Sequence, residues 1–171
     1  MVTPSFRSLP LAAAAYVWVV IATGAVCLGG ALLSATFANP WLFAALLALA
    51  VGTSAAKIEL PLGRLSQSNL SLSHAVNFWA LFSLGIAEAV WIAALSALAQ
   101  CTLNVNRHNP PHRTIFSIAS LVLTVTLAGA PLAYLGVVTI DAASLARAAA
   151  VVAPLYFFAN SLLIAAAIAL A

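Results

Sequence analysis

Residues 74–103 read HAVNFWALFSLGIAEAVWIAALSALAQCTL, and the rest of the predicted architecture follows from this stretch. It is apolar almost throughout, but Gly85 divides it into a short segment and a longer one. A helix over residues 74–84 would be roughly 16–18 Å long, well short of the roughly 30 Å of hydrocarbon in a bilayer. The stretch therefore predicts a short membrane helix that turns back at Gly85 into a second helix over residues 86–103.

The whole chain has the composition of an integral membrane protein. Hydrophobic residues make up 65% of its 171 positions and charged residues only 5%, whereas about a quarter of the residues in a soluble domain are charged. Its Ala- and Leu-rich apolar runs are too long for the alternating strands of a membrane barrel, so helices are predicted. The net charge of +3 comes from residues scattered through the connecting segments, which argues against a nucleic-acid partner.

Breaks in the apolar pattern divide the chain into six predicted helices within a single transmembrane domain over residues 1–171. Asn39-Pro40 ends the first helix, Lys57 follows the second, and Pro110-Pro111 is expected to exclude helix before the fifth. The predicted helices cover residues 10–35, 40–56, 74–84, 86–103, 114–136 and 145–171. The predicted fold class is therefore all-α, a polytopic membrane bundle of six transmembrane helices.

The hydrophobic period changes to two between the second and third helices. Ile58, Leu60 and Leu62 alternate with polar residues and a proline. Leu70 and Leu72 alternate with polar residues after a polar turn. This pattern indicates a small β-hairpin over residues 57–73 at the membrane surface. An ordered interfacial loop fits the same residues equally well.

Positive charge sets the predicted orientation. With six spans and a cytoplasmic N-terminus, only Arg147 of the six basic residues falls outside, as the positive-inside rule requires. One long helix through residues 74–104 would instead divide the basic segments between the two sides. The residues expected on the cytoplasmic side are Arg7, Lys57, Arg64, Arg107 and Arg113.

The turn at Gly85 is also where a binding site is expected. Backbone below the membrane surface is tolerated only against protein or a water-filled cavity, so we expect an outward-opening recess with Gly85 at its floor and Glu88 on its wall. A central charge in a membrane helix costs about 2.5–3.5 kcal/mol and needs a partner or water. Glu88 fits equally well as a carboxylate near the headgroups at a helix N-terminus. The candidate ligand-binding residues are Glu88, Asn77, Asn160 and Gly85; the two amides are also expected to form interhelical hydrogen bonds.

Nothing in the sequence indicates an enzyme. It contains no recognisable nucleophile–histidine–acid set, no glycine-rich phosphate loop and no metal-ligand spacing, so neither a metal nor a cofactor is predicted. His108 and His112 have helical spacing, but Pro110-Pro111 lies between them. Cys27 and Cys101 lie in apolar runs and read as small buried hydrophobes.

Two segments, LSLSHAVNFWALFSLG (70–85) and YFFANSLLIAAAIAL (156–170), resemble a known family. They are similar to the N-terminal membrane-sensor (MASE-like) region of bacterial cyclic-di-GMP signalling proteins, which precedes HD-type phosphodiesterase or GGDEF domains. The likeness covers about residues 40–170, and Asn160 matches it. The chain departs from the pattern at Ile86, where such regions usually have proline, and at Ser117, where they often have asparagine.

This resemblance implies a non-catalytic sensory module in a bacterial inner membrane, with its N-terminus in the cytoplasm. It would relay a signal to a cytoplasmic output domain that is absent from this chain. Partners would be the lipid bilayer, a small-molecule ligand and a second copy of the chain packed on small residues such as Ala25 and Gly29.

Two other functions fit the same residues. More distantly, the hairpin and the broken helix pair resemble substrate-binding subunits of energy-coupling-factor transporters. That resemblance implies, as the alternative, a subunit of a membrane transporter that binds a vitamin-like small molecule. A structural anchor without any ligand is the third hypothesis.

Overall fold

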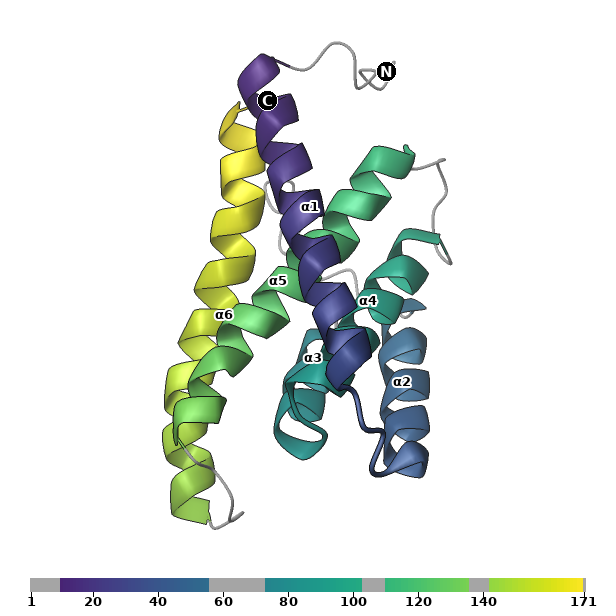
Figure 1. Ribbon diagram of the computed structural model, residues 1–171, viewed down its shortest axis with the longest axis vertical. Coiled ribbons are helices and arrows are strands. Elements are labelled where there is room, and N and C mark those ends of the chain that lie inside the picture. Colours follow the sequence, from purple (N-terminus) through teal and green to yellow (C-terminus); the bar gives the residue numbers. More distant parts are fainter. Residues whose placement is uncertain (1–9, 56–72, 103–109, 136–141, 171) are drawn as a thin grey trace, which may run out of the picture.

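The computed structural model describes residues 10–55, 73–102, 110–135 and 142–170. These residues form six helices and no strand, which confirms the predicted all-α class and number of helices. The hairpin predicted over residues 57–73 lies almost entirely outside the described residues. The helices are α1 (Leu11–Ser34), α2 (Pro40–Ala55), α3 (Ser73–Ser83), α4 (Ile86–Thr102), α5 (Pro111–Leu135) and α6 (Ala142–Leu170) (Figure 1).

Most helix ends fall at the breaks in the sequence. Pro10 directly precedes α1, and Pro40 is the first residue of α2, a position at which proline needs no hydrogen-bond partner. The Asn39 side chain caps α2 by accepting a hydrogen bond from the Leu42 backbone N–H at 3.1 Å. Gly85 separates α3 from α4 with a φ of 101°, a left-handed conformation that glycine adopts without strain.

The starts of the last two helices differ from the prediction. α5 begins at Pro111 rather than residue 114, so the proline pair does not exclude helix as expected. The reason is that proline is tolerated at the first helical position, and the Pro110 carbonyl accepts the Thr114 N–H at 3.4 Å. α6 begins at Ala142, three residues before the predicted start, and continues through Pro154.

α4 lies in the middle of the bundle. It packs against α1, α2, α3 and α5, and nine of its residues are buried. In Figure 1, α1 crosses in front of α5 and α6 lies along the left edge of the bundle, and both helices leave most of their apolar surface exposed. The start of α1 and the end of α6 lie at the same end of the molecule, whereas the α3–α4 turn lies toward the other end.

Among the described residues, three helices are long and apolar enough to cross a bilayer, namely α1, α5 and α6. α2 and α4 have 16 and 17 residues, and α3 has 11, which corresponds to about 16 Å of helix. The described residues therefore contain three candidate membrane spans, and the predicted number of six is not confirmed. The coarser prediction of a membrane-spanning helical bundle is supported.

Two glycines allow close packing around α5. A Cβ atom at Gly24 of α1 would lie 2.7 Å from the Ala119 Cβ, so the two helices cross with almost no space between them. A Cβ atom at Gly129 of α5 would lie 2.8 Å from Ile86 Cγ1 and 2.9 Å from Leu81 Cδ1. Gly129 thereby accommodates the α3–α4 turn against α5.

Candidate functional site

The α3–α4 turn places two of the predicted site residues side by side. Glu88 lies in the first turn of α4, and the Ala89 N–H bonds the Gly85 carbonyl at 3.1 Å. A Cβ atom at Gly85 would lie 3.7 Å from Glu88 Oε2. The glycine is therefore required for the left-handed turn, while the carboxylate lies within ordinary contact distance of its backbone.

The Glu88 carboxylate bonds the connection between α1 and α2. Its Oε1 atom accepts hydrogen bonds from the Thr36 N–H at 3.1 Å, the Thr36 hydroxyl at 3.3 Å and the Phe37 N–H at 3.1 Å. The side chain is only 6% exposed. A charge in an apolar helix requires a partner. For Glu88 that partner is the turn at Thr36 and Phe37, some fifty residues earlier in the chain.

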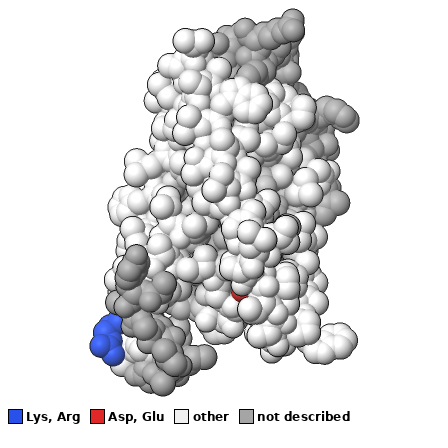
Figure 2. Space-filling model, viewed as in Figure 1, with Lys and Arg blue, Asp and Glu red and all other residues white. Residues whose placement is uncertain are grey.

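Figure 2 shows how little of this carboxylate reaches the surface. Glu88 is the only Asp or Glu in the described part of the chain, and the acidic atoms appear as a small red area enclosed by white atoms (Figure 2). One carboxylate oxygen holds the α1–α2 connection, while the other lies beside the backbone of Gly85. This arrangement stabilises the end of the bundle at which α1, α2, α3 and α4 meet.

A second group of polar side chains joins three helices. Asn77 of α3 is fully buried, and its amide bonds the Ser96 hydroxyl of α4, with Nδ2 and Oδ1 lying 3.2 and 3.4 Å from Ser96 Oγ. The Tyr156 hydroxyl of α6 lies 3.1 Å from His74 Nδ1 and also bonds the Asn77 side chain. We call these four residues, His74, Asn77, Ser96 and Tyr156, the interhelical polar network.

The predicted site residues do not form one cluster. Glu88 and Ser96 are eight residues apart on α4, which separates the Glu88 carboxylate from the interhelical polar network by about 12 Å along the helix axis. Asn160 is half-buried on α6, one turn beyond Tyr156, and makes no hydrogen bond with the described residues. The expectation that Asn77 forms an interhelical hydrogen bond is confirmed, whereas the same expectation for Asn160 is not.

No protein-family model, curated protein or solved structure matches the chain. Its function is therefore inferred from its own contacts.

A buried donor also lies close to Glu88. Trp91 Nε1 is the one buried side-chain nitrogen or oxygen without a hydrogen-bond partner among the described residues. It lies on α4 three residues after Glu88, at the spacing of one helical turn. Buried donors without a partner are rare, because each costs about 1–3 kcal/mol.

Metal-binding side chains do not gather anywhere in the described ranges. No group of three or more His, Cys, Asp or Glu residues there could hold a metal ion. Cys27 and Cys101 are free thiols, both half-buried.

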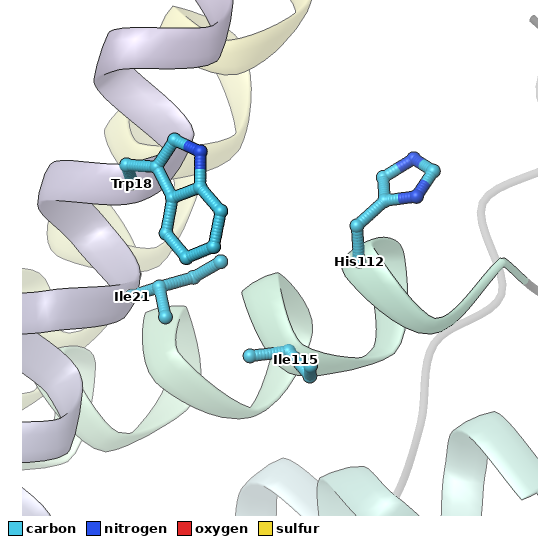
Figure 3. A pocket seen from close by; sticks show the side chains of 4 residues that line it. All are labelled: Trp18, Ile21, His112 and Ile115. Atoms are coloured by element: carbon cyan, nitrogen blue, oxygen red, sulfur yellow. The ribbon is translucent and has the colours of Figure 1, made fainter. Parts of the chain in front are cut away.

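An apolar groove lies between α1 and the first turns of α5. It has a volume of about 140 Å³ and is lined by Trp18, Ile21, His112 and Ile115, which face one another across the gap in Figure 3. We call this the α1–α5 groove. This groove could not be predicted from the sequence, because its residues come from segments about ninety positions apart.

Proposed function

We propose that the chain is a non-enzymatic sensory module in a bacterial inner membrane, which relays a signal to a cytoplasmic output domain. In this proposal the short α3–α4 hairpin responds to the stimulus, and α6 carries the response. The observation that carries the proposal is the Tyr156 hydroxyl, which ties α6 to His74 and Asn77 of α3.

The interhelical polar network has the strength that a reversible switch needs. A hydrogen bond between membrane helices contributes about 0.6 kcal/mol on average. The two contacts of Tyr156, with His74 and Asn77, would contribute about 1.2 kcal/mol, which corresponds to a roughly sevenfold change in an equilibrium between two arrangements of α6 and α3. A ligand would shift that equilibrium only by binding the two arrangements with different affinity.

The Glu88 contacts would keep the other side of the hairpin fixed. Hydrogen bonds to a carboxylate are roughly twice as strong as those between neutral groups, and Glu88 accepts three from the α1–α2 connection. In the proposed mechanism α1, α2 and α4 therefore stay together, while α6 is free to move relative to α3.

The orientation is part of the proposal. Positive charge favours a cytoplasmic N-terminus, and the start of α1 lies at the same end of the bundle as the end of α6 (Figure 1). α6 would then finish on the cytoplasmic side, where an output domain would receive the signal.

Distances between spin labels on α3 and α6 test this proposal. Trp79 and Leu162 are exposed, at 56% and 66%, and suit cysteine labelling in a Cys27→Ser, Cys101→Ser background in lipid nanodiscs. Tyr156→Phe should broaden or shift the distance distribution, because it removes the hydroxyl that joins the helices. A distribution identical to that of the unsubstituted background would contradict the proposal.

Thr126→Val is the matched control for Tyr156→Phe. It also removes one hydroxyl, but the Thr126 hydroxyl bonds only the Val122 carbonyl of its own helix, at 2.9 Å. We expect it to leave the distance distribution unchanged.

One observation favours the alternative function, a small-molecule-binding subunit of a membrane transporter. The buried Trp91 Nε1, which has no hydrogen-bond partner among the described residues and lies on α4 three residues after Glu88, would gain a partner from a ligand with a hydrogen-bond acceptor. This alternative predicts that at least one of a panel of water-soluble vitamins raises the melting temperature of the purified protein, and does so less for Trp91→Phe. No shift with any vitamin would count against it.

The surrounding coding sequence separates the two functions. Continuation past Ala171 into a cytoplasmic catalytic domain would favour the sensor. A neighbouring pair of ATPases with a membrane coupling subunit would favour the transporter.

A further inference from the structure

The donors of the interhelical polar network determine the direction of its hydrogen bonds. The Asn77 amide nitrogen bonds the Ser96 hydroxyl at 3.2 Å, and the Asn77 side chain also donates to the Tyr156 oxygen. With that oxygen accepting, the Tyr156 hydroxyl proton is left for a different partner. That partner is His74 Nδ1, 3.1 Å from the Tyr156 oxygen. Tyr156 therefore donates to His74, and Nδ1 is the acceptor.

An imidazole can accept this hydrogen bond only while it is neutral, because both ring nitrogens of an imidazolium are donors. A proton on His74 Nδ1 would place two donors, the imidazolium and the Asn77 amide, against the Tyr156 oxygen. The Tyr156 hydroxyl proton would then lose its acceptor. Tyr156 is only 8% exposed, so little of it reaches water, and a buried donor without a partner is costly.

His74 has one titratable neighbour among the described residues. The Tyr156 ring lies edge-on to the imidazole with ring centroids 6.0 Å apart, and this ring and its hydroxyl are the contacts of His74. The described part of α2 has no titratable side chain. The other charged or titratable side chains described on α4, α5 and α6 are Glu88, Cys101, His112, Arg113 and Arg147.

The charges of those helices do not compensate a positive charge on His74. Glu88, the one carboxylate among the described residues, lies next to the turn at Gly85, whereas His74 lies at the other end of α3, about 16 Å away along the helix. His74 also lies in the first turn of α3, where the helix dipole is positive and disfavours a cation. An imidazolium would therefore be more stable in contact with water than against Tyr156.

We propose that His74 is a proton-sensitive switch between α3 and α6. While the imidazole is neutral, the Tyr156 hydroxyl bonds Nδ1 and holds α6 against α3. When His74 takes up a proton, this bond loses its acceptor, and the charge favours a separated arrangement in which the imidazolium reaches water. The inference rests on the proposed function, because it names the proton as the stimulus that acts on the α3–α6 contact.

The direction of the pH response follows from which arrangement binds the proton. The closed arrangement requires neutral His74 and the separated arrangement accepts the imidazolium, so acid shifts the equilibrium toward separation. Loss of one membrane hydrogen bond of average strength raises the ratio of separated to closed molecules about threefold. The Tyr156 proton left without an acceptor adds to this effect, so threefold is the smallest change expected.

The same pair of spin labels, at Trp79 and Leu162 in lipid nanodiscs, tests the inference between about pH 8 and about pH 5. In acid we expect an at least threefold larger ratio of separated to closed molecules, with distances approaching those of Tyr156→Phe at high pH. His74→Asn keeps an acceptor oxygen near the position of Nδ1 but takes up no proton, so its distances should not change with pH. His112→Asn is the matched control and should retain the full pH response.

Nitrogen NMR of isotope-labelled histidine in the unsubstituted protein gives a reading that does not depend on how the variants fold. The His74 signals are those absent from His74→Asn. Nδ1 should be an unprotonated acceptor at about pH 8 and should carry a proton at about pH 5. A proton on Nδ1 at high pH, or none in acid, would overturn the inference.

The distance measurements separate failure of this inference from failure of the proposed function. If Tyr156→Phe changes the α3–α6 distances but acid does not, the proposed function stands and the proton is not its stimulus. If neither changes them, both fail. An equal pH response in His74→Asn and the unsubstituted protein would also overturn the inference, because the response would then come from another group.

Discussion

Glu88 Oε1 lies 3.1 Å from the backbone nitrogen of Phe37, the one non-glycine residue with a positive φ in the described part of the chain. A φ of 47° is uncommon for a large side chain, and such a conformation persists only where its surroundings support it. The carboxylate provides that support by accepting two successive backbone N–H groups. The α3–α4 hairpin therefore determines the shape of the turn between α1 and α2.

Replacing Glu88 should destabilise the bundle by an amount that depends on the new side chain. Glu88→Ala leaves two backbone N–H groups without their acceptor and should lower the free energy of unfolding by about 3 kcal/mol. Glu88→Gln keeps one acceptor oxygen, so a loss of about 1 kcal/mol is expected. Unfolding in mixed dodecyl maltoside and SDS micelles measures both, and equal losses would show that the acceptor oxygen does not matter.

Gly24 should tolerate no larger side chain. Gly24→Ala places a Cβ atom 2.8 Å from the Ala119 backbone Cα, which cannot move aside without moving α5, and should cost more than about 2 kcal/mol. Gly29→Ala is the matched control, because nothing lies within 4 Å of its added Cβ atom. The control should be neutral or slightly stabilising, since alanine favours helix by up to about 1 kcal/mol over glycine. Similar melting temperatures for the two variants would refute the close α1–α5 crossing.

Gly85→Ala should weaken the α3–α4 turn through backbone strain alone. Its φ of 101° is disfavoured for every residue with a Cβ atom, which costs about 1–3 kcal/mol. A new Cβ atom would meet no steric clash, because Glu88 Oε2 would lie 3.7 Å away. Gly52→Ala in α2, where a new Cβ atom has open space, should not show this loss. The same unfolding measurement compares the two variants, and equal stability would argue against a left-handed turn.

The bond between Asn77 and Ser96 should be measurable as a coupling energy. A double-mutant cycle with Asn77→Ala and Ser96→Ala should give about 0.6 kcal/mol, and no more than about 1.7 kcal/mol. Asn77→Ala combined with Thr126→Val should show no coupling, because Thr126 bonds only its own helix. A coupling of zero for Asn77 and Ser96 would remove that bond from the network.

The helices were predictable because their ends depend on local chemistry. The turn at Gly85 and the proline at the start of α2 are properties of a few adjacent residues, and both predictions are confirmed. The predicted start of α5 at residue 114 is wrong, because a proline can either exclude a helix or begin one, and α5 begins at Pro111. Three of the described helices are long and apolar enough to be candidate membrane spans, so the number of six spans stays a prediction.

The candidate site was only partly predictable because its contacts cross long stretches of sequence. Glu88 was identified because a charge in an apolar helix needs a partner, but nothing local pointed to Thr36, 52 positions away. Tyr156 was missed because a tyrosine in an aromatic, apolar segment looks like a packing residue until its hydroxyl is placed beside His74. Asn160 and Asn77 were both expected to form interhelical hydrogen bonds, because each is an amide in an apolar helix. Only the fold shows that Asn77 has a partner on a neighbouring helix, Ser96, whereas Asn160 has none among the described residues.

The antiparallel hairpin at Gly85 underlies both the Glu88 contacts and the interhelical polar network, and one distance tests it. Ala75 and Leu98 are exposed positions on α3 and α4 that suit paired spin labels in a Cys27→Ser, Cys101→Ser background in lipid bilayers. Packed antiparallel helices lie about 8–10 Å apart, so a label separation below about 20 Å is predicted. A separation of about 35 Å, the length of 23 residues in one continuous helix, would contradict the hairpin.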